Sequence, residues 1–499
     1  MKKILIIIAV LVIGWLGATF YIGNNIESES QKLINNLQEK YKKMGMELKV
    51  DFKEKSFFSS KAEMTFDYTN PELRKLVSSF YKLPLTTDYT VEHGPLFFKD
   101  GFGTGISRIR SEKSIVSFLN DDLKKDLGLS EKDFVLNTDS VINFNKNLST
   151  KASMAPVKFN NPDNDIGIET ALFQGQSDVN LETLASTGNF SLPFIKVFNP
   201  DEATTEFYHA EGITIDFDIE KFIADGLYIG DISLKTKEVT LSSRDFEGEL
   251  KLKADLDIKI DEDQDKNIKL VYAANAEHIK GDIPEEFIPF KINPKKAAIN
   301  LTVEGLSAEG LIAFQKYSQE VSSKSQKLIE KVMSAEGDDR SETIAELGKF
   351  QQEMQSKMVD LAQGLFAPKK GNISYNVKFE NDHKKMSHAN VNLAYIGDKF
   401  TGSMVDIIEK FKENPFDLFK LNVDLSVDDS LVQAIRNDMN DREKEKTDAG
   451  LKTGIAQGII VKGEDGSYKA KVDYEPNKLI LNGKEMTEMI DMLKMLSQQ

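Results

Sequence analysis

The sequence predicts a mainly β (α+β) protein: an N-terminal transmembrane helix, then an elongated antiparallel β-sheet ectodomain with an inserted helical hairpin. Three observations predict this. Residues 4–22 form one long uncharged, mostly apolar run, and many later segments alternate apolar with polar residues. Residues 308–365 instead repeat apolar residues at helical spacing. Alternation buries one face of each strand and is typical of antiparallel sheets, whereas parallel strands show continuous apolar runs.

Length and composition agree with a folded protein of more than one domain. The chain has 499 residues, which is more than one compact core usually holds. Hydrophobic residues make up 40% of it. Its net charge of −16 argues against nucleic acid as a partner, because phosphate binding needs a cationic face. There are no cysteines, which excludes disulfides, iron–sulfur clusters, thiolate zinc sites and a cysteine nucleophile.

Residues 1–23 predict a membrane anchor. The run from Ile4 to Ile22 carries no charge, and at ~1.5 Å per residue a helix of this length crosses a hydrocarbon core of ~30 Å. Lys2 and Lys3 precede the run, so the positive-inside rule places the N-terminus in the cytoplasm and the bulk of the chain outside. Without these two lysines the exported part has 62 basic and 80 acidic residues, a net charge of −18. Anionic headgroups repel such a surface, and we expect it to extend away from the membrane.

A cleaved signal peptide is the alternative interpretation. Cleavage requires small residues at positions −3 and −1, but a cut after Ala18 places Leu16 at −3. The aromatic end of the run, with Trp15, Phe20 and Tyr21, suits an interfacial anchor. An uncleaved single-pass anchor is therefore favoured.

Residues 24–45 predict an amphipathic stalk helix. The apolar residues Ile26, Leu33, Leu37 and Tyr41 recur at near-helical spacing, and Gly45 is suited to the C-cap. Packing against its own domain is favoured over pairing with a second copy, which would make a homo-oligomer.

Residues 46–305 and 367–499 predict two β-rich regions, the second closed by a terminal helix. Alternation is clearest in the segments 46–53, 62–68, 213–219, 250–260, 299–303, 375–379, 391–395, 419–427 and 468–474. Residues 458–461 also suggest a strand, and Asn482-Gly483 suggests a tight turn. A short helix is predicted near residues 429–440, followed by an exposed charged run at 441–446.

Residues 306–366 predict a helical hairpin inserted between the two β-rich regions. Two apolar stripes at helical spacing are separated by Gly337-Asp338-Asp339, and Asp339 with Glu342 resembles a capping pair. A lid over the sheet is the favoured role, with a mobile cover or a partner-binding arm as alternatives.

The chain shows no recognisable catalytic, cofactor or metal motif. The five histidines are scattered, and His383 and His388 are too far apart for one helix face. The glycine-rich segment 100–105 leads into no helical pattern, so a turn is favoured over a phosphate-binding loop. We therefore expect no catalytic residue, no cofactor and no metal ligand.

One motif stands out: His93, Gly94, Pro95 and Leu96. Pro95 fixes its own φ and lacks an N–H, so the motif predicts a bend after a strand. A structural turn is favoured, and a general-base role for His93 is the alternative.

The chain resembles the YdgA-like family of bacterial inner-membrane proteins, a family of unknown function. The likeness rests on Lys2-Lys3 with the apolar run, the segment VEHGPLFF at 91–98, and the C-terminal residues 458–461, Tyr468 and 478–483. The helix after Gly483 is an extension beyond the pattern. The resemblance implies an envelope protein facing the periplasm of a Gram-negative bacterium, and it supplies no catalytic residues.

Three hypotheses of function follow. The first is a non-catalytic, membrane-anchored periplasmic scaffold or binding protein, whose partner is lipid or another envelope protein. The second is lipid handling, in which an incompletely covered apolar sheet face shelters acyl chains. The third is an anchored hydrolase that uses His93, which would require acidic groups within hydrogen-bond reach of this side chain.

Overall fold

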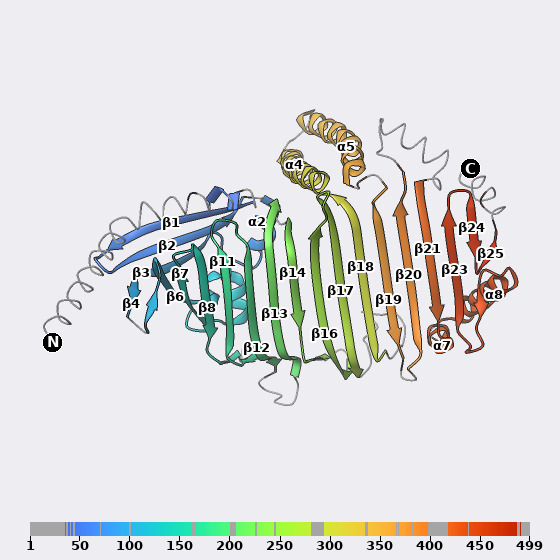
Figure 1. The fold of residues 1–499 in the computed structure, drawn as a ribbon, viewed down its shortest axis with the longest axis horizontal. Coiled ribbons are helices and arrows are strands. Elements are labelled where there is room, and N and C mark those ends of the chain that lie inside the picture. Colours follow the sequence, from blue (N-terminus) through green and yellow to red (C-terminus); the bar gives the residue numbers. More distant parts are fainter. Residues whose placement is uncertain are drawn as a thin grey trace. The chain divides into compact units, whose positions relative to one another are not determined.

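The computed structural model divides the chain into two compact units, Met1–Lys237 and Glu238–Gln499. The structure describes residues 45–69, 71–98, 101–161, 166–199, 206–224, 227–243, 246–280, 294–334, 338–365, 369–381, 384–397, 418–437 and 439–486, together with residues 35, 38, 39, 41, 42, 367 and 490. Antiparallel strands dominate both units, so the prediction of a mainly β protein is confirmed (Figure 1).

The predicted membrane anchor, residues 1–23, lies outside the described part of the chain. Among the helices that are described, none is long and apolar enough to span a membrane. Of the predicted stalk helix, residues 35, 38, 39, 41, 42 and 45 are described; the first five are helical and Gly45 lies in a turn.

In the first unit, a sheet is formed by strands that pair in the order β1, β2, β3, β6, β7, β8, β11, β12, β13 and β14. Their bounds are Met46–Lys55, Ser59–Tyr68, Leu85–His93, Ser107–Ser114, Val135–Ile142, Asn147–Met154, Phe173–Asn180, Ser186–Phe198, Glu206–Ala224 and Leu227–Lys235. Strands β9 (Val157–Asn161) and β10 (Ile166–Thr170) return onto β12, and β4 (Leu96–Phe97) pairs with β5 (Gly103–Thr104). The helical elements are α2 (Pro71–Ser78), η1 (Ile115–Phe118) and α3 (Asp121–Leu127).

The core of the first unit lies on one face of this sheet. Val116, Phe134 and Met154 are buried, and partly buried apolar residues from β9, β10 and β11 pack against them. A second cluster centres on Ala62 and Val91. The η1–α3 segment and the strands β9 and β10 therefore cover part of the apolar face.

In the second unit, the strands pair in the order β15, β16, β17, β18, β19, β20, β21, β23, β24 and β25. Their bounds are Glu238–Ser243, Phe246–Glu262, Asn267–Lys280, Lys296–Ser307, Asn372–Glu380, Met386–Tyr395, Phe419–Val427, Tyr468–Glu475, Lys478–Leu481 and Lys484–Glu485; the short β22 (Val461–Lys462) also pairs with β23. The helices are α4 (Ala308–Ser334), α5 (Asp338–Leu365), α7 (Asp429–Asn437) and α8 (Asp441–Ala456).

Helices α4 and α5 pack on each other and not over the sheet. Tyr317, Leu328 and Phe350 are buried between them. A Cβ on Gly310 would lie 2.0 Å from the carbonyl oxygen of Gly364, so the two backbones touch at this glycine. In Figure 1 the pair lies beyond the ends of the neighbouring strands, so it does not form the expected lid.

The predicted charged run 441–446 is mostly exposed, as expected. It opens helix α8, where Asn440 and Glu443 form a reciprocal capping box. Residues 458–460 form no strand, since Gly458 ends that helix region with φ +72° and only Val461–Lys462 pairs. The predicted turn at Asn482-Gly483 joins β24 to β25, and both residues have positive φ.

Candidate functional site

The motif of His93, Gly94, Pro95 and Leu96 lies where β3 ends and β4 begins. The backbone N–H of Gly94 donates to the carbonyl oxygen of Ile106 at 2.8 Å. A Cβ at Gly94 would lie 1.9 Å from the carbonyl oxygen of Gly105. Only glycine fits this close approach of two backbones, so Gly94 has a structural role.

The imidazole of His93 is buried, with 3% of the residue exposed. Its Nε2 lies 2.9 Å from the hydroxyl of Ser60, and its Nδ1 lies 3.3 Å from the carbonyl oxygen of Phe57. A carbonyl can only accept, so Nδ1 carries the proton and Nε2 accepts from the Ser60 hydroxyl. Burial lowers the pKa of His93, against the opposing effect of the Phe57 carbonyl, and keeps the ring neutral.

This arrangement does not make a usable nucleophile. Ser60 is only 2% exposed, so a substrate has no access to its hydroxyl. The second ring nitrogen of His93 faces a backbone carbonyl and not an acid. The neighbouring carboxylate of Glu92 is paired with Arg110. The pair Ser60–His93 thus holds the β1–β2 turn against the end of β3, and the geometry gives no support to the hydrolase hypothesis.

A cavity of about 350 Å³ adjoins this motif. Its lining combines the polar residues Ser59, Thr90, Glu92 and His93 with the apolar residues Phe58, Leu96, Phe97 and Phe98. Phe97 is buried, whereas Phe58 is 50% exposed and Phe98 is 59% exposed.

The uncovered face of the first unit is polar. The strand register aligns one residue from each of eight strands in a single row: Thr90, Arg110, Asp139, Lys151, Gln176, Asn189, Asp216 and Ser233. A depression of about 790 Å³ lies over this face, lined by residues such as Asn137, Gln174 and Gln176. Such a surface is stable in water without any cover.

Ion pairs fix the charged groups of this polar face. Arg108 donates to both carboxylate oxygens of Asp139, from Nε at 2.8 Å and from Nη2 at 2.6 Å. These hydrogen bonds lower the pKa of Asp139. The bidentate geometry satisfies the guanidinium within the sheet, so this pair stiffens the face.

The second unit has a sheet face made of apolar side chains. Its central row contains Ile258, Tyr272, Leu301, Tyr375, Val391, Val423 and Val472. One flanking row contains Leu256, Ala274, Ile299, Val377, Ala389, Leu425 and Ala470, and the other contains Ile260, Leu270, Val303, Ile373, Leu393, Leu421 and Tyr474. We call these three rows the apolar face.

The described elements cover the apolar face only in part. At its C-terminal edge Tyr474 is buried with Leu479 and Ile490, and Leu421 and Val472 pack against this cluster. Ile260 is also buried. No residue of the central row is buried, and Tyr272, Ile299 and Tyr375 are 37%, 40% and 41% exposed. The opposite face of the same strands carries Asp257, Ala273, Asn300, Asn376, Asn390, Asp424 and Lys471. A sheet with one solvated polar face normally buries its other face, so an exposed apolar face of this extent indicates a binding surface.

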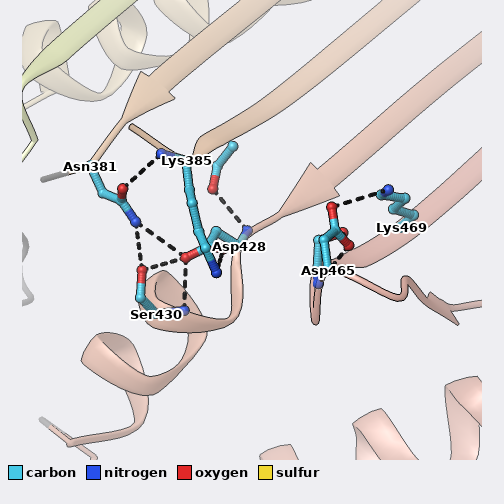
Figure 2. A network of polar contacts seen from close by, with 8 residues as sticks. Asn381, Lys385, Asp428, Ser430, Asp465 and Lys469 are labelled. Carbon is cyan, nitrogen blue, oxygen red and sulfur yellow. Dashed lines mark hydrogen bonds and ion pairs between the residues drawn. The ribbon is translucent and has the colours of Figure 1, made fainter. Parts of the chain in front are cut away.

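A buried polar network closes one end of this sheet (Figure 2). Asp428, which is 4% exposed, accepts from the backbone N–H of Ser430 at 3.0 Å and from Asn381 Nδ2 at 3.2 Å. Lys385 Nζ lies 3.2 Å from its second carboxylate oxygen. Burial by itself would raise the pKa of Asp428, but the bonds from Ser430 and Lys385 outweigh it and the pKa is lowered. The network caps helix α7 and joins it to the β19–β20 turn, which is a structural role.

The other histidines that the structure describes form no metal site. Within the described ranges, no three His, Asp or Glu side chains are placed to hold a metal ion. His388 lies 3.6 Å from Asp424 on the polar face, and His209 lies 3.5 Å from Glu211. His383 lies outside the described residues.

Sequence reasoning missed two features. Ser60 lies far from His93 in the chain, and a serine in a strand carries no signal of such a contact. The apolar face was visible as alternation in each strand, but neither its continuity across strands nor its exposure can be deduced without the register.

The family comparison gives one match. The model described as "Bacterial protein of unknown function (DUF945)" matches residues 1–489, so the chain belongs to this family. The match extends past Gly483, so the segment expected beyond the family pattern is in part included. The YdgA-like assignment stays a prediction. No curated protein and no solved structure matches the chain.

Proposed function

We propose that this member of the bacterial DUF945 family is a non-catalytic envelope protein that holds acyl chains against the apolar face of its second unit. Residues 1–23 would anchor it in the inner membrane, with both units in the periplasm. The observation that carries the proposal is the run of three adjacent apolar rows in which the central row has no buried residue.

The chemistry of the apolar face favours acyl chains over a protein partner. Its three rows contain aliphatic and aromatic side chains, and their polar side-chain atoms are tyrosine hydroxyls. Protein interfaces usually form about one hydrogen bond per 100–200 Å². Hydrocarbon needs no hydrogen bonds and gains ~25 cal/mol for each Å² removed from water. An acyl chain therefore matches the chemistry of the apolar face, which has few groups that form hydrogen bonds.

The membrane location is supported by the sequence alone. The run from Ile4 to Ile22 has the length, the flanking Lys2-Lys3 and the aromatic end of a single-pass anchor. An anchored binding protein stays next to the source of its lipid. Pairing of two copies through the stalk stays a separate prediction, as does binding of another envelope protein as a scaffold.

Site-specific photo-crosslinking in living cells tests the proposal. Benzoylphenylalanine is placed at position 375 on the apolar face in the full chain, and cellular phospholipid is labelled with ³²P. The matched control carries the same group at position 378, an exposed position on the opposite face of the same strand, β19. We expect light-dependent labelling of the protein from position 375 and much less from position 378.

Two results would contradict lipid handling. One is equal labelling from both positions, which indicates contact with bulk membrane lipid. The other is a protein–protein crosslink from position 375 without lipid label, which would move the scaffold hypothesis to first place.

A further inference from the structure

Four exposed phenylalanines gather at one end of the first unit. The exposed fractions of Phe57, Phe58, Phe98 and Phe102 are 39%, 50%, 59% and 74%. The rings of Phe57 and Phe58 contact each other edge to face, with centroids 4.6 Å apart, and the centroids of Phe98 and Phe102 are 5.8 Å apart. We call these four residues the aromatic patch.

The fold holds the two pairs together. Phe57 and Phe58 form the turn between β1 and β2, whereas Phe98 and Phe102 flank the end of β4 and the start of β5. The backbone N–H of His93 donates to the carbonyl oxygen of Phe58 at 2.8 Å, and Phe58 and Phe98 line the same cavity. The buried His93 ring, bonded to Ser60 and to the Phe57 carbonyl, fixes the turn from below. A rigid support is therefore present beneath exposed apolar rings.

The stalk helix runs toward the aromatic patch. Gln38 Nε2 donates to the carbonyl oxygen of Leu48 at 2.8 Å, so the helix folds back along β1 after the turn at Gly45. The ring of Tyr41 contacts Phe66, the β2 residue paired with Leu48, with centroids 6.3 Å apart. The helix therefore runs antiparallel to β1, and its N-terminal direction points toward Lys55, where β1 ends just before the patch.

The length of β1 beyond Leu48 agrees with the length of the stalk helix before Gln38. From Leu48 to Lys55, β1 advances ~24 Å at ~3.4 Å per residue. From Gln38 back to Ile22, where the apolar run ends, a helix at ~1.5 Å per residue also advances ~24 Å. A stalk helix of the predicted extent would thus bring the membrane end of the anchor level with the β1–β2 turn.

We propose that the aromatic patch inserts into the outer surface of the membrane that holds the anchor, and so fixes the first unit upright on the bilayer. The proposal rests on the proposed anchor. Exposed aromatic rings are favoured at the boundary of headgroups and acyl chains. Because the four side chains of the patch are uncharged rings, the contact depends on ring insertion and not on attraction to anionic lipid, and salt has little effect on it.

Tryptophan fluorescence of the full chain in vesicles tests the patch. Trp15 is the single tryptophan, so Trp15→Phe gives a silent background. Phe98→Trp reports on the patch, and Phe80→Trp is the matched control: Phe80 is 54% exposed and lies in the β2–β3 connection, at the opposite end of β2. The vesicles contain phosphatidylethanolamine and phosphatidylglycerol, with or without bromine on the acyl chains.

We expect blue-shifted emission and strong bromine quenching from the indole at position 98, at low and high salt alike. The indole at position 80 should emit as in water and resist quenching. If the chain stays in the vesicles after an alkaline wash but both indoles resist quenching, the patch proposal is wrong and the anchor stands. If the wash releases the chain, the anchor itself is contradicted.

Discussion

At the residue scale, burial decides what His93 does. The sequence left open a turn residue or a general base, and the structure gives the imidazole two short-range partners and almost no exposure. A neutral buried histidine that accepts from a serine stabilises the junction of two segments. Catalysis would require an open Ser60 and a group to stabilise the charged ring, and neither is present at this site.

The lowered pKa of His93 predicts a stability that declines in mild acid. Below the ordinary value of about 6.5 the unfolded chain takes up a proton at this histidine, while the folded chain does not until the pH reaches its lower pKa. The urea midpoint of the wild type should therefore fall between pH 8 and pH 5. His93→Gln removes the titrating group and should show a smaller fall, whereas His278→Asn, at an exposed position, should keep the wild-type fall. Equal falls for wild type and His93→Gln would disprove the assignment.

Asp428 and Asp465 are two network carboxylates that differ in burial (Figure 2). The side chain of Asp428 is 5% exposed and that of Asp465 is 61% exposed. Asp428→Ala leaves Lys385 without its acceptor, removes one of the acceptors of Asn381 and removes the cap of α7. This should cost about 1–3 kcal/mol of unfolding free energy. Asp465→Ala should lower the unfolding free energy much less than Asp428→Ala, because water replaces the partners of an exposed carboxylate. Chemical denaturation measures the unfolding free energy of both variants, and a similar loss of stability in the two would contradict the structural role of Asp428.

The depressed pKa of Asp428 also fixes the pH at which this contribution acts. The stabilisation is complete above the ordinary carboxyl pKa of about 4 and is lost as the pH falls through the lower folded value. The difference in unfolding free energy between wild type and Asp428→Ala should therefore become smaller only in strong acid.

At the scale of elements, strands with small residues on their apolar side escaped sequence reasoning. Strand β8 is rich in Ser and Thr, strand β11 contains two Gln and one Gly, and both show little alternation. The structure explains β11 and the adjoining β12 through their neighbours. The ring of Phe190 occupies the space that a side chain at Gly175 of β11 would need, and the ring of Phe217 does the same at Gly188 of β12. Such compensation between strands is invisible within one strand.

The contact of α4 with α5 predicts an effect of substitution at Gly310. A Cβ there would meet the Gly364 backbone at 2.0 Å, so Gly310→Ala forces the helices apart and should cost about 1–3 kcal/mol. At Gly348 in α5 an added Cβ meets nothing within 4 Å, so Gly348→Ala should be neutral or stabilise by up to ~1 kcal/mol through helix propensity. Thermal unfolding of both variants checks this. A harmless Gly310→Ala would show that the helices do not touch as described.

At the scale of the whole molecule, each unit has one polar sheet face, but the other faces differ. In the first unit, loops and short strands cover the apolar face around Val116, Phe134 and Met154, whereas Ile215 of β13 is 38% exposed. In the second unit, the central apolar row crosses seven strands without a buried residue. The greater extent of this exposed row is why we assign the acyl-chain site to the second unit.

The exposed apolar face predicts binding of a hydrophobic dye by the native protein. Anilinonaphthalene sulfonate should fluoresce with the folded wild type, and Ile299→Thr combined with Tyr375→Thr should lower the signal. Both are exposed, so the loss of stability should stay near ~1 kcal/mol. Asn376→Thr, on the polar face of the same strand, is the control and should leave the signal unchanged. An undiminished signal in the double variant would place the dye, and the apolar site, elsewhere.

The sequence by itself determined the fold class and most of the strongly alternating strands. Alternation and helical spacing are local patterns, and a strand such as β21 or a helix such as α5 follows from its own residues. Only the tertiary structure decided which rows line up, what covers them and which side chains meet. The pairing register between strands aligns the apolar residues of many strands into one face. Contacts such as that of Ser60 with His93 join positions that no local sequence pattern connects.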